Sequence, residues 1–387
     1  MVNQKKKFLR RLLPYGVALA IVFLLVFIPQ KETGFHSLVN DGISYQRGTV
    51  VRVLSQTLEE SPLGGGMLGS QDLTVLLVDG RQVQVVNYLT DTHNILAEEG
   101  TKVIICVDAP EGTAPYYTLY NYDRTRALAL IFAVFVLLML LVGGRRGADA
   151  VLALGVSLLL ILRFTIPAVY RGEPPVIIGV LTVLAATAVT LLLLHGATVR
   201  ALLAAAVTLA GEGAACLLFA ASSALLHISG FLTDQAEGLL VVAQNTGLEL
   251  KTILFAATMI ASLGAVMDVA VSLLSALWEL KQRQENLDGR QLFRSGMNIG
   301  RDMIGTMSNT LIFAFAGNAF AAMLSLTAYG VQAAQLLNSD YIALEAAQGL
   351  CGTGGVILTV PIASAAAAAL FPQMMRPAQG GSRRGKR

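Results

Sequence analysis

The chain has 387 residues, of which 55% are hydrophobic and only 14% are charged. A soluble domain usually carries about a quarter charged residues, so this composition excludes an ordinary soluble protein and favours one that lies in a lipid bilayer. The net charge of +3 is too small to indicate a nucleic-acid partner, and the three cysteines form no metal-binding pattern with each other or with histidine.

The first apolar run, 12–28, follows five Lys and Arg residues and is typical of either a signal peptide or an uncleaved anchor. No small-x-small cleavage pattern follows this run, because the next residues are Pro29-Gln30-Lys31-Glu32. We therefore favour an uncleaved anchor. Residues 1–30 are interpreted as a cytoplasmic N-terminus and a transmembrane helix.

Residues 31–123 differ from the rest of the chain because short alternating stretches are separated by turn signals. Strands are expected at 48–54, 73–78, 82–86, 102–107 and 116–122. Asp79-Gly80 lies between two of them and is a strong hairpin signal. The loop Gly64–Gly66 lacks the Gly-Lys-Ser/Thr of a phosphate-binding loop, so we interpret it as structural. The spacing predicts a small all-β domain, either a barrel or a sandwich.

Seven further apolar runs approach or exceed the ~20 residues that cross the bilayer core. They are 127–142, 148–166, 175–194, 199–226, 252–278, 303–326 and 353–371. Counts of seven or nine helices stay open, because one run is short and another is long. The predicted fold class is an α-helical polytopic membrane protein with about eight transmembrane helices and an inserted small all-β, barrel-like extracytoplasmic domain. Residues 124–372 are then a seven-helix transmembrane domain, and 373–387 a basic cytoplasmic tail.

The orientation follows from the positions of Lys and Arg, which are enriched in cytoplasmic loops. With a cytoplasmic N-terminus, the segments on that side carry eighteen Lys and Arg residues, whereas the short outer loops carry three. This asymmetry predicts that both termini are cytoplasmic and that the β-rich domain is extracytoplasmic.

Ionisable residues at membrane depth are the best functional pointers, because each costs ~2.5 kcal/mol or more at a helix centre. Three consecutive apolar runs carry a polar stripe. The stripe residues singled out are Thr208 and Glu212, Asp268 and Ser272, and Arg301, Asp302 and Asn309. We expect the stripes to meet and line a site for a proton, a cation or a polar solute. The alternative is that protonated carboxyls only join helices by hydrogen bonds.

The energetic cost of burial leads to a geometric expectation for the acidic pair. Since a carboxyl that faces lipid can find no partner, Glu212 and Asp268 should turn inward and share one polar site, with Asn309 nearby and the run 303–326 closing the third side. Arg301 beside Asp302 is a weaker candidate, because such a pair at a membrane boundary is more often a topology anchor. Gly211 and Gly213 on either side of Glu212 could loosen its helix.

Several of these motifs resemble the YibE/F family of bacterial membrane proteins. The segments that carry the resemblance are Gly211–Ala214, Gly230-Phe231, Leu263–Asp268, Ser295–Asp302 and Gly305–Leu311. The resemblance covers about 125–371, and the anchor with the β-rich domain is similar to the longer, YibE-like members. Asn286-Leu287, where the family suggests Asn-Pro, and the absence of a proline after Gly317 depart from the pattern. The resemblance implies a bacterial cytoplasmic membrane protein, with a related membrane subunit as a candidate partner; a homo-oligomer is the other option.

Three classes of function compete. A proton- or cation-coupled transporter needs ionisable residues near the midplane, although no inverted repeat is visible. A non-transporting scaffold or envelope-assembly module would use the outer β domain to bind an extracytoplasmic partner. An intramembrane enzyme is the least favoured, because the sequence contains no His-Glu-x-x-His, no Gly-x-Ser-x-Gly and no phosphate loop. We expect no catalytic residues, no cofactor and no metal.

Overall fold

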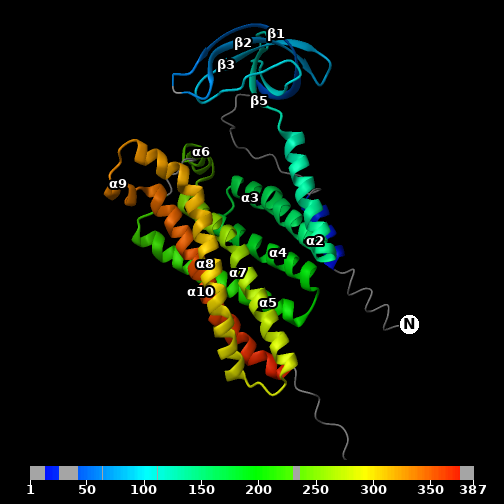
Figure 1. Ribbon diagram of the computed structural model, residues 1–387, viewed down its shortest axis with the longest axis vertical. Helices are drawn as coiled ribbons and strands as arrows, with labels where there is room; N and C mark the ends of the chain where they lie inside the picture. Colours follow the sequence, from blue (N-terminus) through cyan, green and yellow to red (C-terminus); the bar gives the residue numbers. More distant parts are fainter. Residues whose placement is uncertain (1–13, 26–41, 63, 111, 230–235, 375–387) are drawn as a thin grey trace, which may run out of the picture. The chain divides into compact units, whose positions relative to one another are not determined.

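The protein is described by a computed structural model, in which two compact units are separated at residue 143. One unit is His36–Val142, and the other combines Met1–Phe35 with Gly143–Arg387. The first contains the β strands and the second contains most of the helices (Figure 1). The structure describes residues 14–25, 42–62, 64–110, 112–229 and 236–374.

The β strands close into a barrel in the order β1-β2-β3-β5-β4. The strands are β1 (Ile43–Glu60), β2 (Met67–Leu77), β3 (Gln82–Leu89), β4 (Lys102–Asp108) and β5 (Tyr116–Tyr122). β3 and β5 pair in parallel at Val86 and Thr118, and the other neighbouring pairs are antiparallel. This is the arrangement of an OB-type Greek-key barrel. Of the two β architectures expected from the sequence, the barrel is therefore confirmed.

The long first strand is what allows the barrel to close. β1 pairs with β4 through Ile43–Thr49 and with β2 through Gly48–Glu60. Its register shifts between Val50 and Arg52 and again between Val53 and Ser55, and such bulges bend a strand around a barrel. Inward-facing side chains alternate with exposed ones along the strands. The buried core is Val50, Leu73, Val75, Leu77, Val85, Ile95, Ala97, Val103, Ile105, Val107 and Leu119.

The turn between β2 and β3 confirms the hairpin expected at Asp79-Gly80. Gly80 has φ of 87°, and its N–H donates to the carbonyl of Leu77 over 3.0 Å. The Asp79 carboxylate pairs with the Arg81 guanidinium at 2.6 Å. The hydrogen bond from Arg81 also lowers the pKa of Asp79 below its ordinary value. A backbone hydrogen bond and a side-chain ion pair thus both stabilise this turn.

A buried polar network fixes the segment 90–101 to the barrel. Gln71 of β2 is 1% exposed and Asn87 of β3 is fully buried. The Gln71 side chain donates to the carbonyl of Ala97 (3.1 Å) and accepts from the Ala97 N–H (3.0 Å). Asn87 donates to Gln71 (2.9 Å) and to the carbonyl of Ile95 (2.6 Å). These bonds hold Ile95 and Ala97 in the core of the barrel.

Six helical stretches in the described residues are long and apolar enough to cross a membrane, so the expected number of eight is wrong there. The first, Thr125–Tyr170, joins α2 (Thr125–Leu160), the π-helical turn η1 (Ile161–Thr165) and α3 (Ile166–Tyr170). The others are α4 (Pro175–His195), α5 (Val199–Leu225), α7 (Leu250–Arg283), α8 (Gly289–Ala328) and α10 (Asp340–Met374). Two shorter helices are α6 (Ala236–Thr246) and α9 (Ala333–Leu337).

The difference in number arises at two places. The expected spans 127–142 and 148–166 lie in one stretch of 46 residues, which departs from helical geometry at Gly144. Two helices therefore meet at a kink at Gly144, and they are counted as one stretch because no loop separates them. Of the run 12–28, the helix Pro14–Leu25 is described and is too short to count, and the rest lies outside the described residues.

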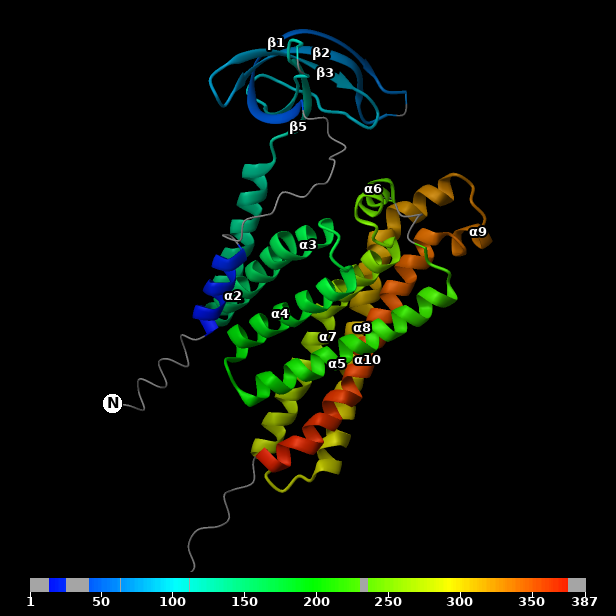
Figure 2. The ribbon, with the colours of Figure 1, turned by 180° about the vertical axis from the view of Figure 1, so that it is seen from behind.

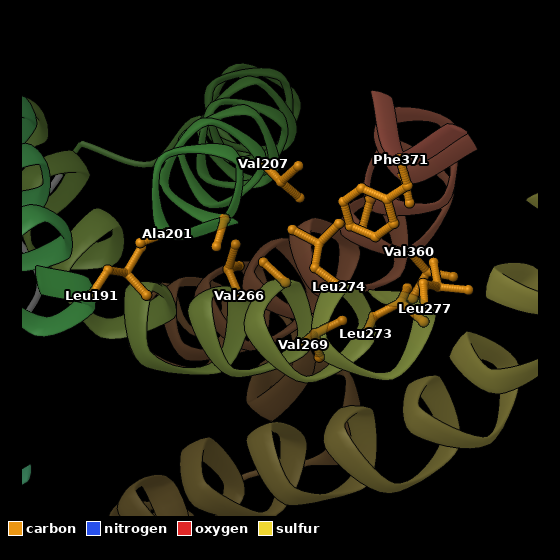
Figure 3. Close-up of a cluster of buried hydrophobic side chains, with 14 of the residues drawn as sticks. Leu191, Ala201, Val207, Val266, Val269, Leu273, Leu274, Leu277, Val360 and Phe371 are labelled. Carbon is orange, nitrogen blue, oxygen red and sulfur yellow. The ribbon is translucent and has the colours of Figure 1, made fainter. Parts of the chain in front are cut away.

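The core of the helical unit lies where α5, α7 and α10 meet. Figure 3 shows Val207 of α5, Val266 and Leu274 of α7, and Phe371 of α10 converging in it. Arg200 lies over the Trp278 ring at 4.9 Å, and Phe371 meets the same ring edge-on at 5.0 Å. α8 runs along α10, as both ribbon views show (Figures 1 and 2). α5, α7 and α10 thus pack together around one buried apolar core.

Candidate polar site in the helical unit

Glu212 lies at the centre of α5, 13 residues from each end of this 27-residue helix. The Thr198 side chain accepts a hydrogen bond from Ala201 N and caps the helix, which continues through Gly211 and Gly213 without a break. Glu212 is 2% exposed. Its Oε1 accepts a hydrogen bond from the Ser262 hydroxyl of α7 at 2.6 Å. A carboxyl is therefore buried at mid-helix with a partner on a second helix.

The third side of this site is α10, not the run 303–326 as the sequence suggested. Gly211 lies so close to α10 that a Cβ there would be 2.0 Å from the Thr359 hydroxyl. A Cβ on Gly355 would likewise be 2.6 Å from the Ala215 Cβ. Small residues permit this approach of helices in lipid. The polar site is consequently enclosed by close backbone packing.

Further polar groups line the junction of the same three helices. Gln348 of α10 donates to the Thr258 hydroxyl of α7 at 3.0 Å, one helical turn from Ser262. Several buried oxygens have no hydrogen-bond partner among the described residues. On α5 they are Glu212 Oε2 and the hydroxyls of Thr208 and Ser223, and on α10 they are the Thr353 hydroxyl and Glu345 Oε2. Such groups call for water, an ion or a second side-chain arrangement, since an unsatisfied buried group costs about 1–3 kcal/mol.

Asp268 is not part of this cluster. It is exposed on α7, and its carboxylate accepts a long hydrogen bond of 3.4 Å from Ser272, which is exposed as well. Asp268 follows Ser262 by six positions, which places the two side chains about 120° apart around the helix. The structure therefore does not bring Glu212 and Asp268 into one enclosed site.

The expected residues of α8 are also exposed. Arg301, Asp302 and Asn309 all lie on the surface of the helical unit. The buried positions of α8 are Leu292, Gly296, Gly300 and Ala319. A Cβ on Gly296 would contact Ser364 and one on Gly300 would contact Val360, so this face is directed at α10. The three polar residues of α8 that the sequence singled out therefore lie on the exposed face of the helix, away from α10.

The sequence pattern indicated Glu212 and Thr208 as candidate residues of a polar site, but it did not indicate the polar residues on α7 and α10 beside them. Thr258, Ser262 and Thr353 lie in apolar runs, where isolated hydroxyls carry little signal, and Gln348 lies between the runs 303–326 and 353–371. The four-residue spacing of Thr258 and Ser262 was the available clue. Among the described residues no group of three or more His, Cys, Asp and Glu could hold a metal. The site consists of one carboxyl among hydroxyls and an amide, which suits hydrogen-bond exchange and proton transfer.

The comparisons with known proteins agree with the motifs. The family model described as YibE/F-like protein matches residues 131–373, which is more than half of the chain and includes Glu212 and its neighbours. The barrel strands precede the matched region. No curated protein and no solved structure matches the chain. The suspected resemblance is confirmed, and the chain belongs to the YibE/F-like protein family.

Proposed function

We propose that the helical unit is a membrane transporter that moves protons, alone or together with a second solute, and that Glu212 is the group that carries the proton. The observation that supports this is a carboxyl at the centre of α5 that is 2% exposed and has one oxygen without a partner among the described residues. Carboxyls at membrane depth are costly and mark proton relays. No catalytic step is assigned to the cluster.

The close packing around Glu212 favours a proton over a larger substrate. Gly211 and Gly355 bring α5 and α10 into backbone contact, so the described conformation is tightly closed at this level. A proton needs only successive hydrogen-bonding groups. The hydroxyls of Ser262, Thr208 and Thr353 supply such groups from three helices. A larger co-transported solute would require the helices to separate.

The test is proton flux into sealed proteoliposomes that contain an internal pH-sensitive dye. A potassium gradient with valinomycin supplies the driving force, and a broad solute panel covers coupled transport. Glu212→Gln keeps size and hydrogen bonding but removes the titrating group, so flux should fall at least tenfold. Glu279→Gln is the matched control, because Glu279 is exposed and pairs with Arg283 at 2.6 Å. Parent-like flux in Glu212→Gln, or no flux in the parent under any gradient, would refute the proposal.

We also propose that the protein lies in a bacterial cytoplasmic membrane with both termini in the cytoplasm. The excess of Lys and Arg on one side of the predicted spans supports this orientation. In a background that lacks native cysteines, Gly65→Cys should react with an impermeant thiol reagent in intact cells. Asn286→Cys should react only after lysis. The reverse pattern would overturn the orientation.

A second candidate function is a membrane module that binds an extracytoplasmic partner through the barrel. The barrel surface carries exposed tyrosines on three strands, among them Tyr45 and Tyr120, whose ring centroids are 4.8 Å apart. A hydrogen bond with Tyr88 raises the pKa of the exposed Tyr116 on the same barrel. Aromatic residues with polar tips are enriched at interfaces.

The second candidate can be separated from the first by cross-linking in cells. A photoreactive phenylalanine derivative in place of Tyr120 should give a discrete adduct under light. The same derivative in place of the exposed Gln84 on β3 is the control. An adduct at both positions, or at neither, would count against a tyrosine-lined binding surface.

A further inference from the structure

A second acidic residue, Glu345 of α10, lies in a different part of the helical unit. It lines a cavity of about 270 Å³ between α8 and α10. Glu345 Oε1 accepts a hydrogen bond from Asn318 at 3.1 Å. Oε2 is buried and has no hydrogen-bond partner among the described residues. Glu345 is five residues, or about 8 Å, from the start of α10, so this cavity is near the α8–α10 connection.

Apart from this carboxyl the cavity wall is apolar. Its lining includes Ile312, Phe315 and Met323 from α8 and Ala346 and Leu350 from α10. Phe315 packs on Gly349, where an added Cβ would lie 3.3 Å from the Phe315 side chain, so α8 and α10 are in contact beside the cavity that both residues line. The cavity therefore combines a hydrophobic wall, one aromatic ring and one acidic oxygen.

The chain offers no positive side chain nearby in sequence to neutralise Glu345. No Lys, Arg or His occurs between Arg301 and Arg376, a stretch that contains most of α8 and all of α10. Glu345 is half-buried with its Oε2 atom fully buried, and such an oxygen without a counter-charge is costly, so a cation that enters the cavity would be favoured. An inorganic cation would need about six oxygen ligands, which this wall does not provide.

We infer that the cavity between α8 and α10 binds a small lipophilic organic cation, with its charged nitrogen beside Glu345 and its apolar body against Phe315 and Ile312. The volume suits a compact molecule, since it lies just below the range of typical ligand pockets. The Phe315 ring adds a face to which a quaternary or tertiary ammonium is attracted. This site does not include Glu212, and the inference does not rest on proton transport.

The test uses the full chain in nanodiscs and radiolabelled benzyltrimethylammonium as the probe. Binding measured by scintillation proximity should be saturable. Unlabelled benzyltrimethylammonium should compete, whereas neopentylbenzene, which has the same shape without the charge, should not. Glu345→Gln should weaken binding at least tenfold. Asp340→Asn, which removes an exposed acid at the start of the same helix, should leave the affinity within twofold.

A third variant keeps the test decisive if Glu345→Gln folds poorly. Ala316→Trp leaves the carboxyl in place and fills the cavity that Ala316 lines, so it should abolish saturable binding. Monodisperse elution of each variant confirms folding. Three results would overturn the inference: no saturable binding by the parent, equal competition by neopentylbenzene, or unchanged binding in Ala316→Trp.

Discussion

Replacing Gln71 by leucine should destabilise the barrel strongly, although the two side chains are similar in size. Gln71 is 1% exposed and bonds both the N–H and the carbonyl of Ala97, and it accepts from Asn87. The substitution leaves these three buried groups without that partner. Each costs about 1–3 kcal/mol, and the added apolar burial offsets part of the sum, so we expect a loss of at least about 3 kcal/mol.

The assay is urea unfolding of a fragment that spans residues 36–124, followed by circular dichroism. We expect this fragment to be soluble and β-rich, since it has its own core. With a slope of about 1 kcal/mol per molar urea, the midpoint should fall by roughly 3 M. Gln84→Leu on the exposed face of β3 is the control and should shift the midpoint little. A shift below about 1 M in Gln71→Leu would refute the reasoning about buried polar groups.

Three further predictions concern close packing, pH and the exposed acid of α7. Gly211→Ala should lower the melting temperature in detergent, because its Cβ would overlap a threonine of α10, whereas Gly213→Ala meets nothing within 4 Å and should be neutral or stabilising. The pKa of Asp123, measured by NMR, should lie below its ordinary value because the side chain and N–H of Thr125 hydrogen-bond to it; Thr125→Ala should raise it. The stability that this bond adds is present above the unfolded-state pKa and is lost as the pH falls through the folded-state pKa, and an unchanged Asp123 pKa in Thr125→Ala would contradict the assignment. Asp268→Asn should retain at least half of the parent flux, and a tenfold loss would show that the exposed carboxyl takes part.

The sequence predicted the barrel well because its signals are local. Alternating side chains and the Asp79-Gly80 turn mark strands within a few residues of each other, and the structure follows them. The length of β1 was underestimated, since bulges allow a strand to continue past the point where alternation fails.

The arrangement of the helices was harder to predict, because apolar runs show which segments are buried but not which face meets which helix. The cost of a charge in lipid correctly singled out Glu212 as buried. The same argument failed for Asp268, which is exposed in the described chain. Helix partners depend on contacts such as Gly211 with Thr359, between positions far apart in the sequence. The number of spans was overestimated at Gly144, where two helices are joined by a kink without a loop and count as one stretch.

The glycine contacts between α5 and α10 have a mechanical consequence. With backbones this close at Gly211 and Gly355, the two helices can neither slide nor rotate against each other without collision. α5 and α10 should therefore move together as one rigid body. α7 contacts Glu212 through the Ser262 hydroxyl and also packs on Gly211, where an added Cβ would be 2.9 Å from Val266 Cγ1. A disulfide tether between α5 and α10 should therefore leave proton flux unchanged, because it joins two helices that do not move against each other.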